Sequence, residues 1–541
     1  MGEAAAYPHE LLYSRFVHRE LSVAWICQAL LLGGQHQLDL GGRRDSASAP
    51  AQPEDAAFDG LEFGCGFGLN LILNAAAHPE GRFYGIDLNP SHVASATALA
   101  AELGLRNVRF AVADLRAFAA GKPERGPWAE WPGQFDLVQA HGVAAWVSAE
   151  VREALVAAAG SLLRPGGVFQ CSYNTNPGWL ARRSLVMLCQ ERALRAGGVV
   201  SASLVRATAE QLGEFLGSEA EPLPLGVAFP SLRSTLEGVL TAADRYLEGE
   251  FHVAHQPLDV GPFHRLCAAH GLTAIGSATL PELFPQMLDP VRRALVEQAE
   301  DPTLRQVLLD LAIDQSFRRD LFARGVCPPS PAERRQTLAA LPVVLRAGSW
   351  PEDCSFDTPL GRMGVDPPFC GALRQGLQAS SLSLGELAEH LAEPLEALLP
   401  RLAVLVHSGL LSLGGWPGVA GDSRPASASL AAFHGRVLAR ASAGDHLGWL
   451  VSPLLLQPVP ITPVEAFFLP LVDQGMAAEE VAQLVWMGIS LAGGSFRDPQ
   501  GCLLEDPAAV MAQLVAGWQT FQRDRLPEWR RLGLVSTANA A

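Results

Sequence analysis

Short apolar runs alternate with helical stretches from about residue 58 to residue 175, and this alternation limits the possible folds more than any other feature of the chain. The apolar runs are LEFG, RFYGID, NVRFAVAD, FDLVQA and GGVFQCSYN, separated by helical stretches such as SHVASATALAAEL. Strands that alternate with helices form βαβ units, in which helices cover both faces of a parallel sheet. Ligands of such sheets bind beyond the carboxyl ends of the strands, so we expect the functional residues there.

Three glycines follow the first of these strands and open the next helix. Gly64, Gly66 and Gly68 have the spacing GxGxG. A dinucleotide-binding loop has GxGxxG and seats its pyrophosphate on the helix N-terminus. Here the third position of that pattern is Leu69, so the loop favours a cofactor without phosphates, which the backbone at the glycines can approach closely. S-adenosylmethionine (SAM) is such a cofactor.

Acidic residues end the strands around this loop. Asp87 ends the next strand, where its carboxylate can accept both ribose hydroxyls, and Asp114 follows the third strand, where it can receive the adenine amino group. Glu62 can orient the loop or reach the methionine ammonium through water. The ordered set predicts a SAM site, and the alternative is a doubly wound domain with a different nucleotide site or none. The candidate cofactor-binding residues are Glu62, Gly64, Cys65, Gly66, Gly68, Asn70, Asp87, Leu88, Asn89, Asp114, Leu115 and His141.

The pattern along the whole chain predicts five segments. Residues 1–57 are expected to form a helical lead-in, capped by Ser22 and ended by Gly33 and Gly34, and then a flexible loop. Residues 58–200 form the Rossmann-like SAM-binding domain, and 201–330 form a helical regulatory or dimerisation domain that includes the stretch QSFRRDLF. Residues 331–418 resemble a winged helix, with Ser383 or Ser381 as a helix cap, and 419–541 form a C-terminal helical domain that begins with a linker.

The charge of the chain bears on its partners. A formal net charge of −16 counts against a sequence-independent grip on nucleic acid, which needs Lys and Arg to neutralise phosphates. The recognition region of the winged-helix-like segment carries four glutamates (386, 389, 393 and 396) and only one arginine, Arg401. We therefore expect it to serve in packing or protein contact and not in reading DNA. Lys122 is the only lysine among 40 basic residues, which fits either arginine-rich codon usage or an enzyme that attacks lysines.

Cysteine usage and hydropathy predict the compartment. The nine cysteines include no CxxC pair, which fits free thiols in a reducing compartment, so cytoplasm is the expected location. The longest apolar runs are short and broken by proline, and the N-terminus has no signal-like pattern, so we expect neither a membrane span nor a signal peptide. His252, His255, His264 and His270 lie close in sequence, but no matching cysteines or carboxylates accompany them. We therefore expect scattered, solvent-facing histidines and no metal site.

Longer segments resemble a known family. EFGCGFGLNLILNAAAHPEGRFYGIDLNPSHV, FDLVQAHGVAAWVS and LLRPGGVFQCSYNTNPGW resemble bacterial class I methyltransferases with a methyltransferase regulatory domain, a group that includes the rickettsial outer membrane protein lysine methyltransferases. RYLEGEFHVAHQPLDVGPFHRLCAAHGLTAIGSA is similar to their regulatory domain, and FQRDRLPEWRRLGLV to their ending. The chain departs from the group at Val23, at Ala144 with Ala145, and in HVAHQ. The resemblance implies a class I fold and a SAM-dependent N-methyltransferase that acts on protein lysine.

Polar and aromatic residues after two strands are candidates for the acceptor pocket and catalysis. Aromatic rings attract an alkylammonium by cation–π contact, and amide and phenol oxygens can orient an amine lone pair. A lysine has a reference pKa of about 10.4 and must become neutral before it can attack. The tryptophans can equally be core residues, and His141 can border SAM or move a proton. The candidates are His141, Trp146, Tyr173, Asn174 and Trp179, with Tyr7, Tyr13 and Phe16 as a lid or an anchor.

Three functions remain open from the sequence. The first is a protein lysine methyltransferase whose helical C-terminal half presents a protein or peptide substrate or forms a homodimer. The second is a methyltransferase of a peptide natural product or small molecule. The third is a non-catalytic SAM-binding regulator, which the intact GxGxG, Asp87 and Asp114 argue against. The acidic surface favours basic protein or peptide partners over nucleic acid.

Overall fold

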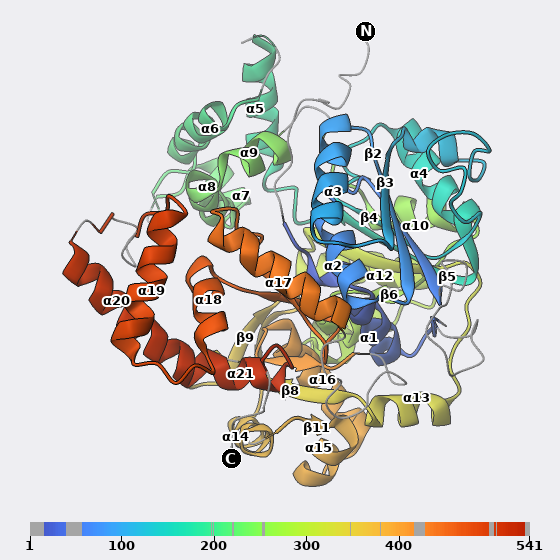
Figure 1. Ribbon diagram of the computed structural model, residues 1–541. Helices are drawn as coiled ribbons and strands as arrows, with labels where there is room; N and C mark the ends of the chain where they lie inside the picture. The colour runs from blue at the N-terminus through green and yellow to red at the C-terminus, as the bar shows by residue number, and fades with distance from the viewer. Residues whose placement is uncertain are drawn as a thin grey trace.

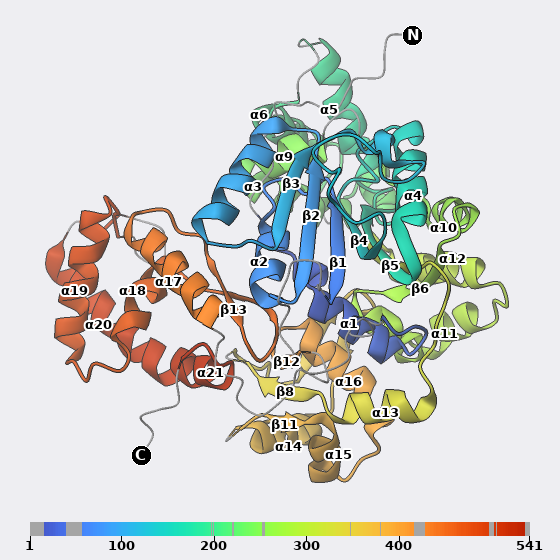
Figure 2. The same cartoon turned by 45° about the vertical axis from the view of Figure 1, so that its right-hand side comes forward.

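A seven-stranded sheet forms the centre of the molecule (Figures 1 and 2). The computed structural model describes residues 16–38, 40, 57–195, 197, 200–218, 221–251, 255–346, 348–378, 380–415, 428–496, 503–504 and 506–535. The strand order is β3-β2-β1-β4-β5-β7-β6; the first five strands in the chain run parallel, and β7 is antiparallel to both of its neighbours. The strands are β1 (Phe58–Phe63), β2 (Gly81–Asp87), β3 (Val108–Val112), β4 (Phe135–His141), β5 (Leu163–Asn174), β6 (Thr273–Ser277) and β7 (Phe317–Ala323).

Helices cover both faces of this sheet, as the alternation predicted. One hydrophobic core joins α1, α2 and α3 to one face, and a second core joins α4 and α10 to the other. Ser148 caps α4, where its side chain accepts a hydrogen bond from the backbone N–H of Val151. The predicted Rossmann-like class I fold is therefore confirmed. These helices are α1 (Val23–Gly33), α2 (Leu69–Ala77), α3 (Pro90–Glu102), α4 (Ala149–Leu162) and α10 (Val260–Ala269), with the short η1 (Arg19–Leu21) and η3 (Leu115–Phe118).

The prediction was wrong for QSFRRDLF, which we expected to be helical. Helix α12 (Pro302–Ile313) ends where Asp314 takes a left-handed conformation, with φ of 51°. The chain then forms β7, which pairs antiparallel with residues 168–174 of β5. Backbone pairing to a buried strand has overridden local helix preference here. Since β6 and β7 complete the sheet, the predicted boundary at residue 200 does not coincide with an end of the sheet, and the domain division stays a prediction.

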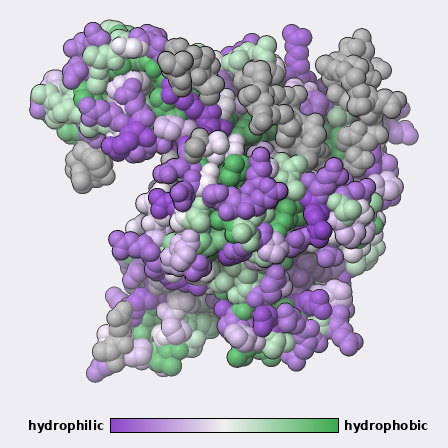
Figure 3. Space-filling model, turned by 90° about the horizontal axis from the view of Figure 1, so that it is seen from below, coloured by the Kyte–Doolittle hydropathy of each residue, from purple (hydrophilic) through white to green (hydrophobic). Residues whose placement is uncertain are grey.

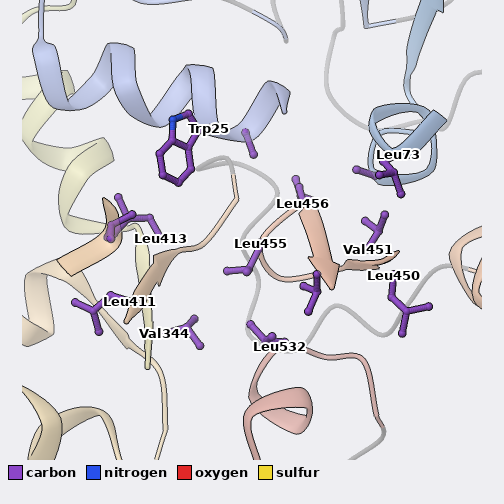
Figure 4. Close-up of a cluster of buried hydrophobic side chains, with 14 of the residues drawn as sticks. Trp25, Leu73, Val344, Leu411, Leu413, Leu450, Val451, Leu455, Leu456 and Leu532 are labelled. Carbon is purple, nitrogen blue, oxygen red and sulfur yellow. The ribbon is translucent and has the colours of Figure 1, made fainter. Parts of the chain in front are cut away.

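The lead-in helix α1 forms as its sequence predicts. The Ser22 side chain accepts a hydrogen bond from the backbone N–H of Trp25, and Gly34 ends the helix in the left-handed conformation, with φ of 68°. Nearly every residue of α1 is buried, because apolar side chains occupy all sides of VAWICQALLL. Figure 4 shows Trp25 of α1 above Leu411, Leu413, Leu455 and Leu456, which come from later parts of the chain.

Polar side chains from four regions fix α1 in place. Asn74 of α2 accepts from the Val23 backbone N–H and donates to the Leu21 carbonyl. The Gln28 amide donates to the carbonyls of Leu413 and Gly414 and accepts from Gln457. At the other end, the Arg334 guanidinium donates to the carbonyls of Leu31 and Leu32, where a cation also favours the helix dipole.

A group of helices follows β5 and projects from the sheet at the top of Figure 1. It has a hydrophobic core of its own, centred on residues such as Leu185, Val205 and Leu236. Some large apolar side chains of this group are exposed, including Leu180, Met187 and Leu194. The predicted homodimer stays a prediction. The helices are α5 (Arg183–Arg195), α6 (Ala202–Glu214), α7 (Pro224–Ala228), α8 (Leu232–Thr241) and α9 (Asp244–Glu250).

Residues 331–413 form a small helical unit with a three-stranded sheet of order β11-β8-β12. Ser383, not Ser381, caps α15 in a capping box with Glu386. The winged-helix interpretation stays a prediction. The elements of this region and those leading to it are η4 (Leu280–Leu283), η5 (Pro285–Met287), α11 (Pro290–Glu297), α13 (Pro331–Ala339), β8 (Pro342–Leu345), β9 (Ser355–Thr358), β10 (Gly361–Gly364), α14 (Pro367–Leu377), β11 (Leu382–Ser383), α15 (Leu384–Leu391), α16 (Leu395–His407) and β12 (Leu411–Leu413).

The C-terminal helices pack beside the sheet domain, at the left of Figures 1 and 2. Arg440 of α17 pairs with Glu102 of α3, which joins the two regions. On the underside of the molecule, hydrophilic residues lie over the whole visible face with apolar ones between them (Figure 3). The elements are α17 (Ala428–Ser442), β13 (Trp449–Ser452), β14 (Gln457–Pro460), α18 (Pro463–Phe468), η6 (Leu469–Leu471), α19 (Ala478–Leu491), α20 (Pro507–Thr520), η7 (Phe521–Arg525) and α21 (Leu526–Arg531). None of the helices in the described residues combines the length and the apolar character needed to span a bilayer.

We predict that Gln28→Leu destabilises the fold by roughly 2–4 kcal/mol, because it leaves two buried carbonyls and the Gln457 amide without their partner. Gln35→Leu is the matched control, since Gln35 lies on the surface just beyond the same helix. Urea unfolding followed by circular dichroism measures both variants. Equal stability of the two would show that this buried amide does not hold α1 in place.

Candidate functional site

The glycine loop lies where β1 ends and α2 begins. Gly64, Gly66 and Gly68 all have positive φ, between 54° and 68°. A side chain at Gly64 would collide with Val143, and one at Gly68 with Phe110, whereas Gly66 has no atom within 4 Å of the place where a Cβ would lie. The loop therefore needs glycine for its conformation throughout, and at Gly66 it presents bare backbone to open space.

Asp87 holds this loop to the start of α3. Its carboxylate accepts from the backbone N–H groups of Gly66 and Asn89, both at 2.8 Å, and lies 3.3 Å from Nδ1 of His92. A carboxylate has about four acceptor positions, and three are used here. That Asp87 accepts both ribose hydroxyls stays a prediction, since these contacts occupy only part of its acceptor capacity. Asn89, another candidate, caps α3 through its side chain.

Glu62 is a buried carboxylate beside the loop. Its side chain is 3% exposed, and Oε2 has no hydrogen-bond partner. Burial, and then the negative charge of Asp87, raise the pKa of Glu62 to about 8. An unpaired buried oxygen of this kind costs stability, so it indicates that a donor or a cation binds here. The structure fits the predicted reach of Glu62 toward an ammonium group, but no ligand tests this role.

The lead-in segment covers the loop and encloses a small cavity of about 50 Å³. The imidazole of His18 lies on that of His141, with ring centroids 3.8 Å apart, and the His18 backbone N–H donates to Oδ1 of Asn70 at 2.9 Å. Asn70 thus holds the lead-in as well as bordering the cavity. Tyr7 and Tyr13 lie outside the described residues. The cavity is lined by Phe16, His18, Glu62, Gly64, Cys65, Gly66, Phe67, Leu69, Asn70 and His141.

Both imidazoles in this cavity are held neutral. Burial lowers the pKa of His18, and it lowers the pKa of His141 well below its usual value; the His18 ring and the Arg319 guanidinium lower the pKa of His141 further. Nδ1 of His141 is buried and has no hydrogen-bond partner. His18 was missed by sequence reasoning, because nothing local links residue 18 to the loop that begins at Gly64. The only sequence signal for His18 was its position as a polar residue just before a capped, apolar helix.

The remaining cofactor candidates lie along the same edge of the sheet, outside this cavity. Leu88 and Val112, at the ends of β2 and β3, are each 41% exposed, an apolar surface that a flat ring could cover. Asp114 caps η3 and is paired with the Arg116 guanidinium, which lowers the pKa of Asp114. An adenine amino group would therefore have to share Asp114 with Arg116. Leu115 follows it, half-buried.

Three of the predicted acceptor residues meet at the end of β5. Nδ2 of Asn174 lies 2.7 Å from Nε2 of His255, and Trp146 stacks on the same imidazole, with centroids 4.5 Å apart and planes 30° apart. Trp179 contacts it edge-on, also at 4.5 Å. The structure therefore brings Trp146, Asn174 and Trp179 together, but it places His255 between them. We call these four residues the indole box.

Tyr173 does not join this group, and its predicted role needs correction. Neighbouring residues of a strand point to opposite faces of the sheet, so Tyr173 and Asn174 cannot both face one pocket. The Tyr173 hydroxyl donates to Oδ2 of Asp320 at 2.5 Å, its ring packs on Phe263, and its side chain is fully buried. Asp320 also pairs with His264 and Arg318. Tyr173 therefore belongs to a buried ionic network and not to an acceptor pocket.

That network also corrects our expectation for the histidines. His255 and His264 are 1% and 6% exposed, not solvent-facing, while His252 lies outside the described residues and His270 is half-buried. Arg318 pairs with Asp310 as well as Asp320, and its positive charge helps to hold the pKa of Asp320 at about 2 although burial opposes this. Among the described residues, no group of three or more histidines, cysteines or carboxylates is arranged to hold a metal ion.

A larger cavity, of about 220 Å³, lies behind the glycine loop. It is formed between α3, the loop and the C-terminal helices, with Leu99, Glu102 and Arg440 among its lining residues. Phe67 and Leu69 line both cavities. The unpaired carboxylate oxygen of Glu62 and the exposed backbone at Gly66 line the smaller cavity. We therefore assign the candidate active site to this cavity and to the sheet edge beside it.

Two protein families match parts of the chain. Residues 61–169 match the family described as methyltransferase domain, and residues 246–324 match the family described as predicted methyltransferase regulatory domain. The first match contains the glycine loop, Asp87 and His141, and the second contains His255, His264 and Asp320. The resemblance drawn from the sequence is confirmed by both matches.

Relatives and solved structures extend this likeness to nearly the whole chain. An uncharacterized protein of Synechocystis sp. is 28% identical over 490 residues, which are 88% of this chain and 91% of that protein. An uncharacterized protein of Rickettsia prowazekii is 34% identical over 119 residues, 22% of this chain and 44% of that protein. PKMT2 from Rickettsia typhi, solved in complex with AdoHcy, has a TM-score of 0.66 at 17% identity and covers 96% of this chain and 99% of its own.

AdoHcy is SAM without its transferable methyl group, so these findings agree with the predicted cofactor. The likeness to PKMT2 shows a shared fold, including the regions outside the sheet. The chain is therefore a methyltransferase of the SAM-dependent class I fold, in which a regulatory domain supplies the last two strands of the sheet.

Proposed function

We propose that this methyltransferase transfers the methyl group of SAM to the side-chain nitrogen of lysine in a protein or peptide. The observation that carries the proposal is the indole box, in which two tryptophans and the Asn174 amide meet at the end of β5. Indole faces attract alkylammonium groups, and an amide oxygen can accept a hydrogen bond from the amine. The guanidinium of Arg182 already lies 5.0 Å from the Trp179 ring, so one indole in the box contacts a cation in this structure.

The cofactor would lie across the carboxyl ends of β1, β2 and β4. Glu62 would hold its ammonium group, the backbone at Gly66 would approach its methionine part, and Asp87 would bind one ribose hydroxyl. The exposed side chains of Leu88 and Val112 would pack on the adenine, beside Asp114. The unpaired oxygen of Glu62 and the open space at Gly66 support this arrangement. When bound, SAM supplies a methyl group activated by a positively charged sulfur.

The residues around the cavity suit a cationic reactant. His18 and His141 stay neutral because burial lowers the pKa of each, so neither opposes a positive sulfur. Asp87 provides negative charge beside the loop, and Glu62 provides it once a bound ammonium group favours loss of its proton. Methyl transfer needs mainly the alignment of donor and acceptor, and good alignment contributes roughly 7–11 kcal/mol of barrier reduction. Holding both reactants at fixed strand ends is therefore the main contribution of this chain.

The character of the surface supports a protein substrate. The net charge of −16 attracts basic partners, and the chain itself carries one lysine, Lys122. The likeness in fold to PKMT2 extends over the helical regions that could present a large substrate. The sequence resemblance to rickettsial protein lysine methyltransferases points in the same direction. A peptide natural product or small molecule remains the competing acceptor, and the experiment below separates the two.

Incubation with SAM labelled in its methyl group and a cell lysate tests the proposed acceptor. We expect label to enter proteins and to be recovered as methyllysine after hydrolysis. Asp87→Ala should abolish both the label and SAM binding, since it releases the loop at Gly66 and the start of α3. Label found only in metabolites or short peptides would favour the competing acceptor. Binding of SAM without any label would favour the non-catalytic regulator.

We predict that SAM binds more tightly as the pH rises from about 6 to 8. Glu62 has a pKa of about 8 in the free protein, so it is mostly protonated at pH 6, and an ammonium favours its charged form. The α-amino group of the ligand has a reference pKa near 8, so affinity should fall again at higher pH. Calorimetric titration in buffers of different pH measures this change. Glu62→Gln should flatten the acidic side of the profile, and an unchanged profile would contradict the role of Glu62.

Tyr173→Phe and Asn174→Ala should differ in what they impair. Tyr173→Phe removes the hydroxyl that donates to the buried Asp320 carboxylate, so we expect a loss of stability of about 1–3 kcal/mol. Asn174→Ala should slow methyl transfer more than it lowers stability. Neither change should alter SAM affinity, because neither residue borders the cavity. Thermal unfolding, calorimetry and single-turnover labelling measure the three effects, and weakened SAM binding in both variants would contradict the assignment.

A further inference from the structure

The larger cavity, of about 220 Å³, has no role in the methyl transfer described above. Protein interiors contain few voids larger than a water molecule, so a space of this size is unusual. An apolar cavity of about 150 Å³ binds benzene, which means that this one has room for a single aromatic ring with a small substituent. The exposed residue Ala98 belongs to its lining, so the cavity can be reached from solvent. Its size and access suit the binding of a small molecule.

One face of α3 forms a wall of this cavity. Because Ser95 and Ala98 have small side chains, this face leaves space between α3 and the C-terminal region. Across the space lies Leu447, which is 9% exposed and precedes β13. The lining residues of α3 have the spacing i, i+3, i+4 and i+7 of a single helix face: Ser95, Ala98, Leu99 and Glu102.

The charged groups in the lining neutralise each other. Glu102 pairs with Arg440 of α17, and Arg440 pairs in turn with Asp445. An ionic ligand would therefore lose its water of hydration here without gaining an unpaired counter-charge. The Arg440 guanidinium still has donor capacity, because its Nε is buried without a hydrogen-bond partner in the described part of the chain. These walls suit an uncharged, mainly apolar molecule that carries one acceptor oxygen.

The cavity shares a wall with the candidate active site. Phe67 and Leu69 line both cavities, and they stand on either side of Gly68 in the glycine loop. Leu69 begins α2, and the Phe67 ring packs on His92 of α3, with ring centroids 4.7 Å apart. A molecule in the larger cavity would therefore contact the same two residues that line the cofactor cavity from the other side.

The opposite wall belongs to the C-terminal region. Figures 1 and 2 show α17 beside α2 and α3. Arg436 and Arg440 lie one turn apart on α17, and both hold the end of α3 at Glu102. The Arg436 guanidinium donates to the Glu102 carbonyl at 3.2 Å, where a cation favours the helix dipole. The cavity thus lies between the cofactor loop and a region that makes no contact with the smaller cavity.

We propose that the larger cavity is a regulatory site for a small, uncharged, mainly apolar molecule with one acceptor oxygen. An occupant tightens SAM binding, because it fills the empty space behind the shared wall and so favours the position in which that wall meets the cofactor. By linkage, SAM tightens binding of the occupant by the same factor. The inference goes beyond the proposed function and holds for any methyl acceptor.

Benzyl alcohol is a suitable probe, since it combines one aromatic ring with one oxygen. Ligand-observed NMR titration of the full-length protein should show saturable binding of benzyl alcohol. Calorimetric titration should show several-fold tighter SAM binding at saturating benzyl alcohol, and SAM should raise the affinity for the alcohol equally. No saturable binding of benzyl alcohol, or the same SAM affinity with and without it, would overturn the proposal.

Ala98→Leu fills the cavity from α3 and locates the probe. It should abolish benzyl alcohol binding and, with it, the effect of the alcohol on SAM affinity. Ala94→Leu is the matched control, because Ala94 is exposed one turn earlier on the same helix and lies outside the lining. Leucine is a good helix former, so both variants should fold. Benzyl alcohol binding that survives Ala98→Leu, or that is lost equally in Ala94→Leu, would contradict this site.

Benzoate tests the chemical class of the ligand. It has nearly the shape of benzyl alcohol but carries a negative charge, which Glu102 and Asp445 disfavour beside Arg440. We expect benzoate to bind several-fold more weakly than benzyl alcohol in the same NMR titration. Equal or tighter binding of benzoate would overturn the assignment to uncharged ligands.

Discussion

Burial of the apolar helix α1 is the interaction on which the rest of the structure depends. A helix that is apolar on all sides cannot lie on a surface, so it must be enclosed by several other elements. Here the enclosing elements come from the sheet domain, from residues 331–413 and from the C-terminal strands, as Figure 4 shows around Trp25. Gln28 and Arg334 satisfy the polar groups that this enclosure would otherwise leave unpaired. The same enclosure places the preceding residues over the glycine loop, which is how His18 reaches the site.

The parts of the fold that could be predicted are those encoded locally. The first five strands, the glycine loop, and the caps at Ser22 and Ser383 all follow from patterns within a few residues. Strand β7 could not be read in this way, because its stretch follows a long helical pattern and becomes a strand by pairing with β5, some 150 residues earlier. The separation of Tyr173 from Asn174 could have been predicted, since residues in a strand alternate between faces.

The candidate site was predictable to a similar degree. Glu62, Gly66 and Asp87 lie together because parallel strands bring their carboxyl ends to one edge, and the order of strands in the sequence is enough to infer this. The acidic groups were identified, but their partners were not. Asp87 binds two backbone N–H groups and lies near His92, and Asp114 pairs with Arg116, which only the folded loops reveal. His255 was out of reach for sequence reasoning, because its place depends on hydrogen bonds to Ala145 and Asn174.

The lead-in segment limits how much of a ligand the cavity can enclose. Asn70 fixes the His18 backbone over a cavity of about 50 Å³, far smaller than the several hundred Å³ typical of sites for molecules the size of a nucleoside. The cavity therefore has room for only part of such a molecule, and the rest would lie along the exposed sheet edge at Leu88 and Val112. The hydrogen bond from His18 to Asn70 ties the cover of the cavity to the first turn of α2, so a substitution at Asn70 would disturb the cover and the wall of the cavity together.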